Sequence, residues 1–189
     1  MCGKYHISTE DENLIFREAI RQMMLEHPGI AIKTGDVLPS QAAPVYHKTG
    51  LSPMRFGHKA NFAKSLIINA RSETAHESPL FAPALRTFRV LVPATAFYEW
   101  SPQKKPHLFG RADKKTLYMA GLAFPGQDIA DFVILTRDAA GKPAQVHPRM
   151  PVIFPSLELQ KAWLEQDSLA IDLLRLPDEG EYAEMKATG

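Results

Sequence analysis

The most chemically distinctive residue of the chain is Cys2, its only cysteine, which stands between Met1 and Gly3. A small residue at position 2 permits removal of Met1, and the new terminus would carry an α-amine and a thiol on the same residue. These groups titrate near pH ~7.7–8.0 and ~8.5, so both are partly nucleophilic at neutral pH. The amine can form an imine with an aldehyde, and the thiol can then add to close a thiazolidine ring. Cys2 therefore indicates an aldehyde substrate, unless it is an incidental small residue at the terminus.

Three more polar segments interrupt a largely apolar chain, and each contains a residue suited to proton transfer or hydrogen bonding. They are Asn69–Thr74, Phe97–Trp100 and His147–Pro151. Glu99 lies among aromatic residues, where desolvation would raise the pKa of its carboxyl, and an imidazole titrates near neutrality. Each segment also has a purely structural interpretation. Asn69 would be a turn former, Arg71 and Glu73 a surface ion pair, Glu99 a solvent-facing strand residue, and His147 an ordinary loop residue.

Length and composition predict one globular domain. The chain has 189 residues, of which 45% are hydrophobic and 23% charged, enough for an ample core. No apolar run reaches the roughly 18 residues of a membrane span, and the N-terminal residues lack the apolar stretch of a signal peptide. A single cysteine excludes an internal disulfide and fits a reducing compartment. We therefore expect a cytoplasmic protein without a membrane segment.

Charge is distributed unevenly along the chain. The segment from Leu157 to Gly189 contains eight acidic and three basic residues, a net charge of −5. Because the whole chain has a formal net charge of +1, the first 156 residues have a net charge of +6. A mildly basic body is compatible with a localised phosphate-binding patch.

The elements that must position these residues follow an α+β pattern in which mostly antiparallel strands dominate. Thr9–Glu12 has the form of a capping box and predicts a helix to about His27, where Pro28-Gly29 ends it. Further helices are expected over 78–85, 156–166 and 169–174. An extended stretch over 35–46 leads to a turn at 48–50, and strands are expected over 66–68, 88–93, 96–100, 107–111, 116–124 and 131–136. Residues 177–189 are expected to be poorly ordered.

Five collinear segments together resemble the SOS response-associated peptidase (SRAP) family, which shields abasic sites in single-stranded DNA. The family pattern is M-C-G-R-Y/F, M-x-W-G, I-N-A-R-x-E-T, V-P-A-x-G-F-Y-E-W and H-x-R-M-P. Here these segments are Met1–Tyr5, Met54–Gly57, Ile68–Thr74, Val92–Trp100 and His147–Pro151. The resemblance covers roughly residues 1–165. It implies one SRAP domain over 1–176, with a mainly antiparallel, barrel-like β core and a few flanking helices, followed by a disordered tail over 177–189.

The resemblance also implies roles for four catalytic residues. Cys2, freed of Met1 by the protein's own peptidase activity, would attack the C1′ aldehyde of an opened abasic sugar and form a covalent crosslink. Glu99 would shuttle protons during imine formation and ring closure. His147 would help to open the deoxyribose ring, and Asn69 would hydrogen-bond the Cys2 amine or the sugar oxygens.

DNA binding is implied for a second set of residues. Arg71 and Arg149 suit phosphate, because a planar guanidinium matches its oxygens, and Lys4 replaces the usual arginine of the first motif. Phe62 would stack on bases near the lesion, although a core position is the alternative. The full set is Gly3, Lys4, Pro39, Phe62, Lys64, Arg71, Arg149 and Met150.

The sequence thus predicts a covalent sensor of abasic sites in single-stranded DNA that needs no cofactor and no metal. A monomer is expected, with single-stranded DNA as its substrate and replication or repair proteins as further partners. Two alternatives remain open. The first is a cysteine hydrolase in which His147 and Glu99 assist Cys2, and the second is a module that binds single-stranded DNA without a covalent step.

Overall fold

The computed structural model describes residues 2–8 and 14–186. Short strands account for most of the regular structure, as the frequent prolines and glycines lead one to expect. The strands are β1 (Tyr5–Ile7), β2 (Gly35–Val37), β3 (Ala42–His47), β4 (Gly50–Phe56), β5 (Asn69–Arg71), β6 (Arg89–Ala94), β7 (Ala96–Trp100), β8 (Pro106–Arg111), β9 (Leu117–Phe124), β10 (Asp131–Asp138), β11 (Arg149–Pro151) and β12 (Tyr182–Met185). The helices are α1 (Leu14–Glu26), α2 (Phe81–Thr87), α3 (Leu157–Glu165) and α4 (Ala170–Arg175), with single 3₁₀ turns at Pro143–Gln145 and Asp167–Leu169.

The strands form two sheets, one of which closes on itself. In the first sheet the order is β12-β8-β7-β1-β2, and all neighbours are antiparallel. In the second sheet β10-β4-β3-β6-β9 follow one another, and β9 pairs back with β10 to complete a ring. Only the pairings of β10 with β4 and with β5 are parallel among the named strands of the described residues. The predicted α+β fold with a mainly antiparallel, barrel-like core is confirmed.

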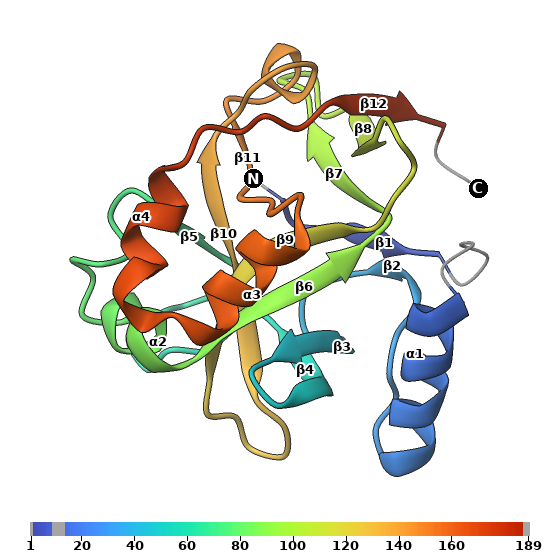
Figure 1. Ribbon diagram of the computed structural model, residues 1–189, viewed down its shortest axis with the longest axis vertical. Helices are drawn as coiled ribbons and strands as arrows, with labels where there is room; N and C mark the ends of the chain where they lie inside the picture. Colours follow the sequence, from blue (N-terminus) through green and yellow to red (C-terminus); the bar gives the residue numbers. More distant parts are fainter. Residues whose placement is uncertain (1, 9–13, 187–189) are drawn as a thin grey trace.

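β10 lies between the two apolar clusters of the core and contributes side chains to both. Its side chains alternate between two faces, as the two-residue period of a strand requires. Phe132 and Ile134 belong to the apolar cluster inside the barrel, whereas Val133 and Leu135 belong to the cluster beneath the helices. Figure 1 shows α2, α3 and α4 gathered on one side of the barrel and α1 on another. Trp163 of α3 is fully buried there and donates its indole N–H to the carbonyl of Val90 at 2.9 Å.

The helices begin close to where the sequence predicts. Ser156 caps α3, since its hydroxyl accepts a hydrogen bond from the Leu159 N–H at 3.3 Å. α2 begins at Phe81, three residues after the predicted start at Ser78. The predicted capping box at Thr9–Glu12 lies outside the described residues, and α1 is described from Leu14. None of the helices in residues 14–186 is long and apolar enough to cross a membrane.

Two predictions of local structure are wrong. The strand expected at 66–68 lies instead at Asn69–Arg71, because these residues pair with β10 while Ile67 makes only an isolated bridge. The tail expected to be disordered contains β12, which pairs antiparallel with β8. Tyr182 of β12 is buried and meets the ring of Phe97 edge to face, with ring centroids 6.2 Å apart. The edge of β8 therefore pairs with a polar segment whose composition does not predict a strand. Residues 187–189 lie outside the described chain.

Candidate active site

Strand pairing brings Cys2 and Glu99 into one region of the molecule. Cys2 precedes β1, which pairs with β7 so that Tyr5 lies opposite Phe97. The Tyr98 N–H also donates to the Lys4 carbonyl at 3.0 Å. Glu99 is therefore carried on the strand next to the N-terminal segment. Both Cys2 and Glu99 are fully buried, so the interpretation of Glu99 as a solvent-facing residue is wrong.

Asn69 reaches the same region from the second sheet. It is the first residue of β5 and lies opposite Ile134 of β10. Its side-chain amide donates to the carbonyl of Cys2 at 3.2 Å and to the carbonyl of Ile134 at 3.4 Å. Asn69 thus ties the backbone of Cys2 to the barrel.

His147 completes the group from the turn that precedes β11. Its Nδ1 lies 3.5 Å from Oε2 of Glu99. The same nitrogen lies 3.0 Å from the backbone nitrogen of Arg149 and 3.1 Å from its carbonyl oxygen. The structure therefore brings Cys2, Asn69, Glu99 and His147 together from four separate segments.

Burial dominates the electrostatics of this region. It raises the pKa of Glu99 above its ordinary value, and attraction to His147 offsets only part of the rise. Burial, and secondarily the charge of Glu99, raises the pKa of the Cys2 thiol. The thiol is therefore protonated at neutral pH, and Glu99 retains a proton to higher pH than an exposed carboxyl does.

Tyr5 is a component that the sequence analysis did not single out. Burial raises the pKa of Tyr5, and the nearby Cys2 contributes to the rise. Its hydroxyl is buried and has no hydrogen-bond partner within residues 2–8 and 14–186. Tyr5 is the last residue of the first motif, Met1–Tyr5, and this position is the only sequence signal that points to it.

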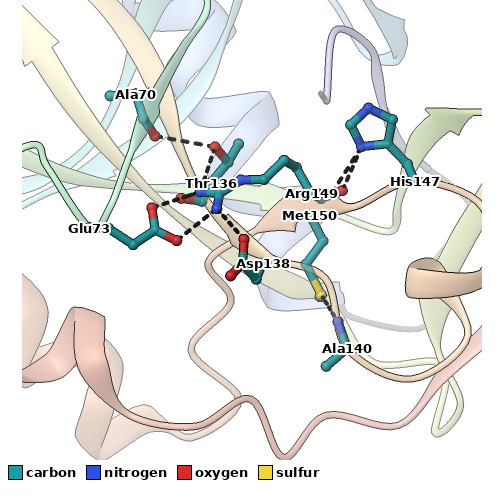
Figure 2. Close-up of polar contacts among 8 residues, drawn as sticks. All are labelled: Ala70, Glu73, Thr136, Asp138, Ala140, His147, Arg149 and Met150. Carbon is teal, nitrogen blue, oxygen red and sulfur yellow. Dashed lines mark hydrogen bonds and ion pairs between the residues drawn. The ribbon is translucent and has the colours of Figure 1, made fainter.

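The two predicted phosphate-binding arginines lie in different surroundings. Arg71 is exposed, and its guanidinium makes no hydrogen bond or ion pair within the described chain. The guanidinium of Arg149 instead donates to both carboxylate oxygens of Glu73, at 2.7 and 2.8 Å, and to Asp138 at 2.7 Å (Figure 2). The surface ion pair considered between Arg71 and Glu73 is therefore wrong, because Glu73 pairs with Arg149.

Lys4 also has protein partners. Its ammonium lies 2.6 Å from Oδ2 of Asp36 and 4.2 Å from the ring centre of Tyr98. Gly3 beside it is half-buried, and so is Pro39, which lies in the turn between β2 and β3. A phosphate at Lys4 would therefore share the ammonium with Asp36.

The segment that follows β4 presents one aromatic side chain to solvent. Phe62 is 77% exposed, so the alternative of a core position is wrong. The ammonium of Lys59 donates to the carbonyls of Ala63 and Lys64, at 2.8 and 3.0 Å, and ties the segment into a turn. Lys64 itself is exposed. These residues remain candidates for contacts with DNA.

Met150 corrects the predicted set of DNA contacts. It is fully buried, and its sulfur accepts a hydrogen bond from the Ala140 N–H at 3.3 Å (Figure 2). Because Met150 has no exposed surface, its side chain cannot contact DNA in this structure. Met150 belongs to the core cluster, where its side chain holds β11 against the barrel.

Metal ligation has no evident place in the described residues, since His, Cys, Asp and Glu nowhere gather there in groups of three that could hold an ion. The chemistry available in this region is that of a thiol, a carboxyl, an imidazole and an amide. These groups suit addition to a carbonyl and proton transfer.

Comparisons with a family model, with related sequences and with solved structures agree with the resemblance that the five motifs indicate. A family model described as SOS response associated peptidase (SRAP) matches residues 1–188. The abasic site processing protein YobE of Bacillus subtilis (strain 168) is 30% identical over 196 positions, covering 93% of this chain and 87% of that protein. The abasic site processing protein YedK of Escherichia coli (strain K12) is 28% identical over 183 positions, covering 88% and 81%. A crystal structure of a protein from Bacteroides thetaiotaomicron has a TM-score of 0.75 at 19% identity and covers 98% and 93%; that likeness concerns the fold alone.

Proposed function

Because this chain belongs to the SOS response-associated peptidase family, we propose that it processes abasic sites in single-stranded DNA by capturing them covalently. In this proposal the protein removes its own Met1, and Cys2 becomes the first residue. Its amine and thiol then form a thiazolidine with the aldehyde of an opened abasic sugar. The observation that carries the proposal is the convergence of Asn69, Glu99 and His147 around the buried Cys2.

The covalent step needs one amine, one thiol and proton transfer. The α-amine of Cys2 attacks C1′ of the open-chain aldehyde, and the resulting carbinolamine loses water to give an imine. The thiol sulfur then bonds to the imine carbon, and the thiol proton passes to the imine nitrogen. One water is released in total, and no oxidant or reductant is needed.

Glu99 and His147 supply the proton transfers in this scheme. Since burial raises the pKa of Glu99, its carboxyl can protonate the departing hydroxyl and afterwards accept the proton of the thiol. His147 assists the opening of the deoxyribose ring, which exposes the aldehyde. Asn69 keeps the backbone of Cys2 in register with both groups through its 3.2 Å hydrogen bond.

The raised pKa of the Cys2 thiol favours this scheme over a cysteine hydrolase. Hydrolases attack amides with a thiolate, whose pKa neighbouring cations or helix termini lower. Here burial and the charge of Glu99 act in the opposite direction. Addition to an imine tolerates a protonated thiol, because an adjacent base removes the proton during ring closure.

Intact mass spectrometry tests the proposal directly. The protein is incubated with a single-stranded oligonucleotide that has one abasic site, and separately with the undamaged oligonucleotide. We expect a mass that corresponds to loss of Met1, and a heat-stable adduct equal to protein plus DNA minus one water, with the damaged strand only. Binding to the damaged strand without any adduct would instead support the non-covalent module.

Two variants distinguish the thiazolidine crosslink from a cysteine hydrolase. Cys2→Ala should form no heat-stable adduct, but its surviving amine should still give an imine that borohydride traps. A tag that cannot be removed from the front of Cys2 should block the adduct, whereas a hydrolase would tolerate it. A heat-stable adduct from Cys2→Ala would exclude the thiazolidine.

A further inference from the structure

The turn that presents Phe62 is part of a longer segment, residues 57–68, which we call the Phe62 loop. Its two ends are held together at the base. The His58 N–H donates to the carbonyl of Ile67 at 2.8 Å, and the Ile67 N–H donates to the carbonyl of His58 at 2.9 Å. Phe62 lies between these ends and is 77% exposed. The position of its ring therefore depends on what fixes the base of the loop.

Both ends of the Phe62 loop are also attached to β10. At the start of the loop, the Gly57 N–H donates to the carbonyl of Phe132 at 2.7 Å. At its end, the carbonyl of Ile68 accepts a hydrogen bond from the Ile134 N–H at 3.0 Å. The next residue is Asn69, the first residue of β5 and a member of the candidate active site. The Phe62 loop is therefore attached to the barrel directly beside that site.

The imidazole of His58 fastens the base of the loop to two strands. Its Nδ1 lies 3.1 Å from Oδ2 of Asp131, the first residue of β10. Its ring stacks on Phe124, the last residue of β9, with ring centroids 4.4 Å apart and an angle of 16° between the planes. Asp131 and Phe124 lie opposite each other where β9 pairs with β10. One ring thus contacts both members of a cross-strand pair.

The partners of His58 are themselves held by the surrounding elements. The side chain of His58 is 17% exposed and that of Asp131 is 10% exposed, so water competes little for the contact between them. The second carboxylate oxygen of Asp131 lies 3.6 Å from a terminal nitrogen of Arg55 in β4. Phe124 is buried and meets Phe81 of α2 edge to face, with ring centroids 6.3 Å apart. Supports that are locked by packing and polar contacts hold a side chain closely in position.

Order in the loop matters for binding, because a ring that is already held in place loses less conformational freedom when a base stacks on it. Lys59 closes the turn around Phe62 through the carbonyls of Ala63 and Lys64. His58 closes the base through its backbone and its imidazole. These two neighbouring residues therefore hold the loop on which the exposed Phe62 ring depends.

We propose that His58, held by Asp131 and Phe124, is a positioning residue that keeps Phe62 in place to stack on a base of single-stranded DNA beside the abasic site. This inference rests on the proposed function, because it assigns the Phe62 loop a task in binding the damaged strand. It adds to that function a specific anchor for the stacking residue.

A double-mutant cycle with Phe62 tests this proposal. His58→Ala should weaken binding to an undamaged single-stranded oligonucleotide at least about threefold, because Phe62 is no longer held in the stacking position. In the Phe62→Ser background, the same change should have almost no effect on affinity, because no ring is left to position. Fluorescence anisotropy measures all four affinities under conditions in which each variant is folded. Equal losses in both backgrounds would mean that His58 has only a general structural role, and would overturn the proposal.

His107→Ala is the matched control. The imidazole of His107 stacks on Phe109, with ring centroids 6.4 Å apart, and its Nδ1 lies 2.7 Å from the carboxylate of Glu184. Its side chain is 16% exposed, against 17% for His58. Because His107 belongs to β8 and lies outside the Phe62 loop, its replacement should show no coupling with Phe62→Ser. Coupling as strong as that of His58→Ala would contradict a specific anchor.

Hydrogen exchange in the free protein gives a second readout. In His58→Ala the Ile67 amide should exchange at least about tenfold faster, because the base of the loop opens locally, while the amides of β6 should exchange as in the wild type. Unchanged exchange at Ile67 would show that the imidazole does not hold the base, and the proposal would fail. His58→Phe keeps a ring against Phe124 but lacks the contact with Asp131, and it serves for both tests if His58→Ala does not fold.

The anchor and the covalent capture can fail separately. The affinities are measured with undamaged DNA, and the exchange rates are measured without DNA. A wild-type protein that shows the expected coupling but forms no adduct would refute the proposed function and leave the anchor in place.

Discussion

Glu99 combines two properties that oppose each other, since its carboxyl is both fully buried and ionisable. Its pKa in the folded protein lies above the ordinary value of about 4.5. Folding therefore favours the protonated form. Burial of the charge therefore lowers the free energy of unfolding. This loss of stability is absent below the ordinary pKa, and it grows as the pH rises from the ordinary pKa through the raised pKa. A group that costs stability at neutral pH and faces a thiol and an imidazole is typical of a functional site.

Glu99→Gln should separate stability from activity. The variant lacks the buried charge, so its urea midpoint at pH 7 should exceed that of the wild type, while at pH 4 the two should nearly coincide. Adduct formation should fall about 10²- to 10⁴-fold, the range of general acid–base catalysis. An equal difference in midpoint at both pH values would show that the effect does not come from ionisation of Glu99.

Arg71 is exposed, and it is one of the two arginines that the sequence predicts to bind phosphate. Arg71→Ala should weaken binding to undamaged single-stranded DNA and reduce the slope of log affinity against log salt by about one, because one phosphate contact is lost. Arg17→Ala, which removes an exposed arginine of α1, is the control and should leave both quantities unchanged. Fluorescence anisotropy at several salt concentrations measures them. An unchanged slope in Arg71→Ala would remove Arg71 from the phosphate contacts.

At the scale of elements, the turn around Phe62 shows how a loop presents a side chain without burying it. Lys59 bonds to two carbonyls of the turn, so the backbone is held while the ring stays in solvent. An aromatic ring that is 77% exposed contributes little to folding and is available for stacking on bases.

Phe62→Ser should therefore change the free energy of unfolding by less than about 0.5 kcal/mol. It should weaken binding to single-stranded DNA by about 1–3 kcal/mol, the loss of one stacked base. Phe88→Ser is a matched control, because Phe88 is an aromatic residue that is 56% exposed and lies outside the predicted DNA contacts. Equal losses of affinity in both variants would indicate a nonspecific effect of surface hydrophobicity.

At the scale of the whole molecule, the closed barrel depends on close approach between strands. Gly121 of β9 lies opposite Val90 on one side and Ile134 on the other, at the point where β9 joins β6 to β10. A Cβ at this position would lie 2.9 Å from the carbonyl oxygen of Val133 and 2.9 Å from the side chain of Val90. The first contact is with backbone, which cannot move aside without distorting the barrel.

Gly121→Ala should destabilise the fold by about 1–3 kcal/mol through overpacking, as measured by chemical denaturation. Gly29→Ala is the control, because a Cβ there would meet nothing within 4 Å, and it should have little effect. Because β10 pairs with the strand of Asn69, adduct formation should slow in Gly121→Ala as well. A variant that is as stable as the wild type would show that the barrel can relax at this point.

The sequence by itself determined the class of fold, most of the strands and the four residues that converge on the site. Local patterns decide these features: alternation and turn residues define strands such as β7, whose predicted and observed bounds agree, and short motifs identify Cys2, Asn69, Glu99 and His147. Only the tertiary structure decided that Glu99 is buried, that Met150 belongs to the core, and that Arg149 pairs with Glu73 and Asp138. It also decided that Tyr182–Met185 form β12. Each of these depends on contacts between segments far apart in the chain, and local sequence does not encode which partner a side chain or a strand edge will find.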